Sequence, residues 1–114
     1  MRALALPGAK AERRARRHYR LRGYRILGAN ARLAGVEVDL ICRRGRTVVF
    51  CEVKEKLHDR FGDPLEMVDE RKQERLRRAA EMWLARQRED VFVIRFDVVS
   101  LRAGRLERLE RAFS

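Results

Sequence analysis

The chain has 114 residues, and we predict that residues 1–114 form a single domain with one hydrophobic core. Hydrophobic residues make up 46% and charged residues 39% of the chain, a balance that excludes a disordered protein. No apolar run reaches the roughly 18 residues of a membrane span, and residues 1–7 are too short for a signal peptide. We therefore expect a cytoplasmic protein.

The charge is strongly basic. Lys and Arg number 28 against 17 Asp and Glu, which gives a net charge of +11, and residues 1–25 hold nine basic residues and one acid. Domains this basic typically bind a polyanion. Nucleic acid is the first candidate and an anionic membrane surface the second, while an arginine-rich coding bias is the alternative without a ligand.

The N-terminal part predicts a helix followed by a strand. Ala11 or Glu12, Ala15 and Tyr19 share one face at helical spacing between residues 9 and 22, and Gly23 supplies the C-terminal stop. The short apolar segment 24–30 then predicts a strand.

Two alternating segments predict a β-hairpin. Residues 36–42 and 47–54 alternate apolar and polar side chains around a turn at residues 43–46. A four-residue turn pairs Cys42 with Thr47. The same register places Asp39 opposite Phe50, and it places Glu37 opposite Glu52.

The C-terminal half predicts a loop at residues 58–64, a helix over 65–88 and a strand over 91–99. Residues 105–113 fit a short strand or a short helix. The order α-β-β-β-α-β predicts an α/β fold in which helices flank a small mixed β-sheet.

The predicted hairpin collects charged groups on one face: Glu37, Asp39, Glu52 and Lys54. Carboxylates this close repel one another, so either Lys54 or a divalent cation must neutralise them. Asp39, Glu52 and the carbonyl of Val53 supply the oxygen ligands that suit Mg²⁺ or Mn²⁺. The same alternation is also compatible with an ordinary charged face in solvent.

Two helical residues favour the site. Lys72 falls on the apolar stripe of its helix, and Glu12 is the only acid in the basic N-terminal segment. The chain has four lysines among its 28 basic residues, and two of them, Lys54 and Lys72, fall at these positions.

The remaining metal-binding residue types do not form a site in the sequence. Cys42 and Cys51 face away from the carboxylates, and we predict free, reduced thiols that pack as small apolar groups. His18 and His58 lack zinc-site spacing, and we expect surface or packing roles for them.

Several short motifs together resemble the UPF0102 (YraN) family. They are Gly23-Tyr24, Glu37-Val38-Asp39-Leu40-Ile41, Phe50-Cys51-Glu52-Val53-Lys54, Phe61-Gly62, Lys72 and Phe96-Asp97-Val98-Val99. That family is similar to archaeal Holliday junction resolvases and to restriction-endonuclease-like PD-(D/E)xK nucleases. The resemblance implies a nuclease core with Asp39 and Glu52 as metal ligands and Lys54 as the catalytic lysine. It also implies that Glu12 and Lys72 belong to the site.

From these observations we expect an endonuclease that uses Mg²⁺ or Mn²⁺ to hydrolyse phosphodiester bonds in structured or branched DNA. Basic residues of the first helix are candidates for phosphate contacts: Arg13, Arg16, Arg17 and Arg20. A non-catalytic nucleic-acid-binding module on the same fold is the alternative, and an RNA-processing or RNA-binding protein is a third. A homodimer would suit paired cuts across a junction.

Overall fold

The computed structural model describes residues 9–56, 68–88 and 92–114. The elements in chain order are α1 (Ala9–Leu21), β1 (Arg25–Leu33), β2 (Val36–Arg44), β3 (Thr47–Lys56), α2 (Glu70–Ala85), β4 (Val93–Arg102) and β5 (Arg105–Phe113). The predicted order is confirmed, and the unassigned segment 105–113 is a strand. The predicted loop at residues 58–64 and the residues from 65 to 67 lie outside the described part.

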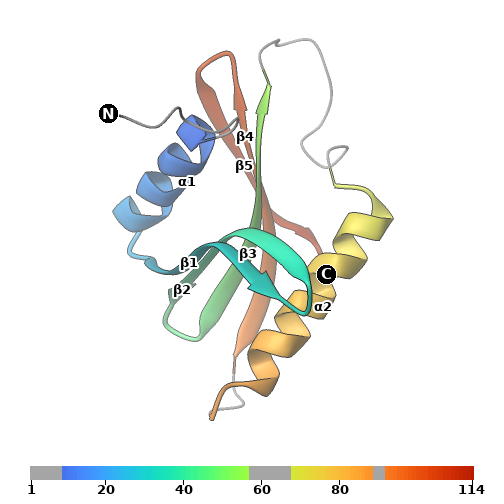
Figure 1. Ribbon diagram of the computed structural model, residues 1–114. Coiled ribbons are helices and arrows are strands. Elements are labelled where there is room, and N and C mark those ends of the chain that lie inside the picture. Colours follow the sequence, from blue (N-terminus) through green and yellow to red (C-terminus); the bar gives the residue numbers. More distant parts are fainter. Residues whose placement is uncertain (1–8, 57–67, 89–91) are drawn as a thin grey trace, which may run out of the picture.

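The strands form one mixed sheet. Across the described residues, five strands lie in the order β1-β2-β3-β4-β5; β3 and β4 are parallel, and the other neighbours are antiparallel. The parallel pair is the one that needs a crossover, which contains α2. The two helices cover opposite faces of the sheet (Figure 1). This three-layer arrangement confirms the predicted α/β fold and is consistent with a nuclease-like core.

Each face of the sheet has its own apolar cluster. Ala11, Ala15 and Tyr19 of α1 pack with a first set of strand residues that includes Leu40, Cys42, Val49, Cys51, Val53, Val99 and Leu101. Leu76, Ala79 and Ala80 of α2 pack with a second set that includes Ile41, Val48, Phe50, Phe96 and Val98. Alternation in the central strands therefore splits the core into two halves.

Helix α2 begins later than predicted. Residues 68 and 69 precede it, and the Asp69 side chain caps its N-terminus by accepting the Lys72 backbone N–H at 2.9 Å. An aspartate at this position satisfies one of the amide groups that the first helical turn leaves unpaired. Val68 is nevertheless buried, so it extends the apolar stripe of the helix without being helical.

The hairpin register differs from the prediction by two residues. Arg44 pairs with Thr47 and Cys42 with Val49 around a two-residue turn whose Gly45 has a φ of +59°. The predicted pairing of Cys42 with Thr47 is wrong, because a left-handed glycine allows a tighter turn. A shift of two residues keeps the alternation from Leu40 to Arg44, but Val38 packs with Ile41 in the second cluster instead of with Leu40 in the first.

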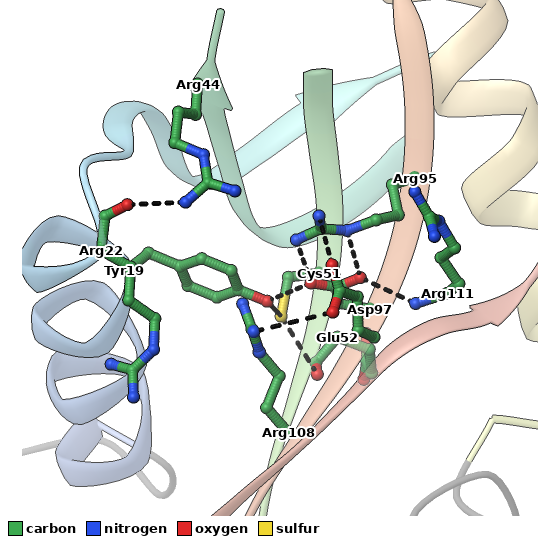
Figure 2. A network of polar contacts seen from close by, with 10 residues as sticks. Tyr19, Arg22, Arg44, Cys51, Glu52, Arg95, Asp97, Arg108 and Arg111 are labelled. Atoms are coloured by element: carbon green, nitrogen blue, oxygen red, sulfur yellow. Dashed lines mark hydrogen bonds and ion pairs between the residues drawn. The ribbon is translucent and has the colours of Figure 1, made fainter.

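A buried polar network connects α1, β4 and β5 (Figure 2). Asp97 has no exposed surface and accepts hydrogen bonds from Tyr19 Oη at 2.6 Å and from Arg95 Nε and Nη2 at 2.9 Å each. The Arg111 backbone N–H donates to the same carboxylate at 3.1 Å. Glu110 lies 2.7 Å from Arg95 Nη1 and completes the charge balance.

Cys42 and Cys51 are both free and buried, as predicted, although their cross-strand partners are Val49 and Leu40. Neither described helix has the length and apolar character needed to cross a membrane.

Candidate metal centre

Two carboxylates meet where β2 and β3 separate. The β2–β3 ladder ends at the pair Leu40 and Cys51, and Asp39 and Glu52 lie one residue beyond it. The Val53 backbone N–H donates to Asp39 Oδ2 at 2.9 Å, so the aspartate replaces the missing strand partner. This interaction fixes the Asp39 carboxylate beside the C-terminal half of β3.

The two carboxylates border a hollow of about 440 Å³. Its lining contains all seven residues that the sequence assigns to metal binding or catalysis, together with one more acid: Glu12, Glu37, Asp39, Glu52, Val53, Lys54, Lys72 and Glu55. Helices α1 and α2 both contribute, with Glu12 and Lys72, so the site lies between the two helical layers at one end of the sheet.

The Asp39 carboxylate has an unusual proton affinity. Burial and the negative charge of Glu52 raise its pKa to about 7, and Glu12 adds to the effect, while the Val53 N–H acts in the opposite direction. A raised pKa means that the protein groups around Asp39 compensate its negative charge poorly. A cation beside Asp39 would remove the penalty.

Glu52, by contrast, has two ammonium partners. Its side chain is 5% exposed, and its Oε1 lies 2.5 Å from Lys72 Nζ and 3.3 Å from Lys54 Nζ. Burial lowers the pKa of Lys72, but the contact with Glu52 outweighs burial and leaves that pKa raised. Lys72 is therefore a permanent positive charge at the site.

The other predicted ligands lie further out. Glu12 Oε2 accepts a hydrogen bond from Asn30 Nδ2 at 3.3 Å, and Glu37 is exposed. Among residues 9–56, 68–88 and 92–114, no three acid, histidine or cysteine side chains come close enough to hold one ion together. The geometry thus supports a pair, Asp39 and Glu52, and leaves Glu12 and Glu37 at the border of the hollow.

The paired carboxylates fit a hard divalent cation. Both supply oxygen donors, Asp39 has no ion-pair partner within the described part of the chain, and the hollow leaves room for water and a phosphate oxygen beside them. Mg²⁺ commonly binds through one or two carboxylates and keeps several waters or phosphate oxygens in its other positions. Among the residues that the structure describes, no cysteine or histidine borders the hollow, so this donor set does not suit zinc.

The arginines predicted to contact phosphates lie along α1. Arg13, Arg17 and Arg20 are exposed, and Arg16 is half-buried. Arg16 follows Glu12 by one helical turn, so it is the member of the set that helical spacing places nearest the hollow.

Two basic residues of the site were missed in the sequence. Arg32 of β1 and Arg75 of α2 line an adjoining hollow of about 230 Å³, which shares Glu37, Glu52 and Lys72 with the first. Helical spacing could have identified Arg75, because it lies three residues after Lys72. No local signal identifies Arg32, because it reaches the site through the pairing of β1 with β2.

In comparisons with known proteins, most of the chain matches one family. The model of the uncharacterised protein family UPF0102 matches residues 11–101. A UPF0102 protein of Klebsiella pneumoniae is 41% identical over 104 residues, which cover 90% of this chain and 81% of that protein. Another from Alkalilimnicola ehrlichii is 42% identical over 108 residues, covering 94% and 86%. A third from Yersinia pseudotuberculosis is 43% identical over 110 residues, covering 94% and 93%.

Proposed function

The chain belongs to the UPF0102 family, and we propose that it is a metal-dependent endonuclease that hydrolyses phosphodiester bonds in structured or branched DNA. The observation that carries the proposal is the pairing of Asp39 with Glu52 beside two lysines in one hollow. The choice of branched DNA rests on the resemblance of the sequence motifs to Holliday junction resolvases.

Asp39 and Glu52 would hold Mg²⁺ or Mn²⁺, and the Val53 carbonyl is the proposed third protein ligand. When bound, such an ion lowers the pKa of a coordinated water and stabilises negative charge on a phosphate. Asp39 is held for this task by the Val53 N–H, and Glu52 by its two lysine contacts. Because these contacts already hold both carboxylates in place, ion binding does not have to restrict their side-chain conformations further.

The lysines have separate roles in the proposal. Lys54 lies on the same strand as Glu52, and we assign it the orientation of the attacking water. Lys72 keeps its proton, so it would stabilise the charge that develops on the phosphate in the transition state.

Binding to the polynucleotide would come from the basic surface. The net charge of +11 and the exposed arginines Arg13, Arg17 and Arg20 of α1 favour phosphate contacts without sequence readout. With six or more phosphates engaged, affinity should fall by roughly 10³ or more between 50 and 200 mM salt. An affinity that does not change with salt would contradict this part of the proposal.

A plasmid- and junction-nicking assay with Mg²⁺, Mn²⁺ or EDTA tests the reaction. Asp39→Asn and Glu52→Gln should abolish metal-dependent cleavage and weaken Mn²⁺ binding in calorimetry, while DNA affinity stays nearly unchanged. Lys54→Ala should stop cleavage but keep Mn²⁺ affinity, because lysine is not a ligand. Glu81→Gln is the matched control, since it neutralises an exposed acid of α2 outside the hollow.

The second candidate is a nucleic-acid-binding module without turnover. The observation in its favour is that Lys54 and Lys72 already neutralise Glu52. Under this alternative the wild-type protein binds DNA or RNA but cleaves neither, and Asp39→Asn leaves Mn²⁺ binding unchanged. Cleavage that requires Asp39 would exclude it.

A further inference from the structure

A separate hollow, of about 350 Å³, lies at the opposite end of the β2–β3 hairpin from the carboxylates. The described residues that line it are all arginines or glycines: Gly23, Arg25, Arg43, Arg44 and Gly45. The glycines form the α1–β1 and β2–β3 turns, with φ of +86° and +59°, and they carry no side chain that could cover the arginines. A concave surface of this composition is suited to an anion.

Two of the guanidinium groups are already fixed. Arg44 Nη1 donates to the Arg22 carbonyl at 2.9 Å (Figure 2). Its guanidinium lies 4.5 Å from the centroid of the Tyr24 ring. Arg43 Nε donates to the Gly45 carbonyl at 2.7 Å, and its guanidinium lies 4.7 Å from the centroid of Phe92. Each keeps further N–H donors for a ligand, and little side-chain entropy remains to be lost on binding.

The third arginine, Arg25, brings a like charge to the strand position opposite Arg43. Arg25 and Arg43 are directly opposite each other on β1 and β2, where like charges repel. Within the described ranges, no acid lies within ion-pair distance of Arg25, Arg43 or Arg44. A bound anion would relieve this repulsion.

We propose that this hollow binds a backbone phosphate of the polynucleotide, outside the cleavage site. The inference rests on the proposed function and extends it to a second point of contact. Arg44 follows Asp39 by five residues of β2, which corresponds to roughly 17 Å of strand. That span equals about five base-pair steps of B-form DNA, so one duplex can reach both places.

The decisive variant is Arg25→Gln, because this exposed side chain has no hydrogen bond to any other described residue that the fold would lose. We expect it to raise thermal stability, by removing the repulsion with Arg43, and to weaken DNA binding at the same time. Binding of a 20-base-pair duplex is measured by fluorescence anisotropy in EDTA, so that cleavage is absent. The slope of log Kd against log salt should fall by about 1.

The double variant Arg43→Gln/Arg44→Gln should lower affinity about tenfold or more and reduce the slope further, with a melting curve confirming that it folds. Arg78→Gln on the exposed side of α2 is the charge-matched control and should leave the slope unchanged. If Arg25→Gln and Arg78→Gln have equal effects on the slope, the proposed phosphate site is wrong. Nicking assays distinguish this site from the proposed nuclease activity. If Arg25→Gln lowers the slope but the wild-type protein does not cleave DNA, the phosphate site is retained and the nuclease proposal is rejected. If the wild-type protein cleaves DNA but Arg25→Gln leaves the slope unchanged, only the phosphate site is rejected.

Discussion

Asp39 is partly buried and Asp97 is fully buried on the same sheet, and their hydrogen-bond environments differ sharply. Asp97 accepts hydrogen bonds from four donors, which is about the full capacity of a carboxylate. Asp39 accepts one from the Val53 N–H, and burial beside Glu52 raises its pKa to about 7. The first lies inside a closed network (Figure 2), and the second borders an open hollow.

The contrast separates a carboxylate that stabilises the fold from one that is available for a ligand. A carboxylate whose lone pairs are all occupied has no capacity for an ion, and its removal leaves charged partners unpaired. A carboxylate that is crowded and poorly compensated costs stability until a cation binds. The same residue type should therefore respond in opposite directions to mutation at the two positions.

The largest effect is expected at Asp97. Asp97→Ala leaves Arg95 buried without its main partner, and we expect the free energy of unfolding to fall by about 3–5 kcal/mol. Urea denaturation measures the change, with the exposed-site variant Glu81→Gln as the control within about 0.5 kcal/mol of wild type. A loss below about 1 kcal/mol would mean that the network contributes little to the stability of the fold.

A smaller loss is expected for Tyr19→Phe. The change removes one hydrogen bond, of 2.6 Å, to the charged carboxylate of Asp97, and such a bond contributes about 1.5–3 kcal/mol. A double-mutant cycle in the Asp97→Ala background supplies the control, since the penalty should shrink when the acceptor is absent. Equal penalties in both backgrounds would assign the effect to packing of α1.

Asp39→Asn should have the opposite sign. Because its pKa rises from 3.8 unfolded to about 7 folded, Asp39 contributes stability below about pH 4 that is lost as the pH rises through 7. In EDTA at pH 8 the variant should melt higher than wild type by on the order of a few °C, and the difference should narrow toward pH 5.

Thermal melts of wild type, Asp39→Asn and Glu81→Gln at pH 5 and pH 8 measure this pH dependence. The Glu81→Gln difference should be the same at both values, because that acid is exposed on α2. A variant that is less stable than wild type at pH 8 would show that Asp39 stabilises the fold as Asp97 does.

The two aspartates also differ in how far the sequence predicts them. Alternation in β2 and β3 predicts the face that carries Asp39 and Glu52 even though the predicted pairing is two residues off, because side chains repeat every two residues. Which residue of β3 lies beside Asp39 depends on the conformation of Gly45 in the turn. The alternation of apolar and polar residues carries no information about that conformation. The composition of the turn, with Gly45 at its centre, could have favoured the shorter loop.

The sequence carries only part of the signal for the Asp97 network. Arg95 lies two residues before Asp97 on the same strand, but the other two partners are Tyr19, which is 78 residues away in the sequence, and the backbone of Arg111. Both contacts depend on how α1 and β5 pack against β4, and no local pattern specifies that packing. Helix periodicity predicts only that Tyr19 is buried, as it is, and not what its hydroxyl meets.

The smallest expected effect concerns the two thiols between these regions. Burial raises the pKa of Cys42 to about 12, and burial also raises that of Cys51 well above its ordinary value, with the charge of Asp97 acting in the same direction. Little thiolate therefore exists at pH 8, and both sulfurs are inaccessible. We expect native wild-type protein to show essentially no alkylation by iodoacetamide over an hour, and mass spectrometry without reductant to show two free thiols.

In Asp97→Ala both cysteines should react faster, because the destabilised network opens more often, whereas in Asp39→Asn they should remain protected. Equal protection in Asp97→Ala and wild type would indicate that the network and the core around Cys51 open independently.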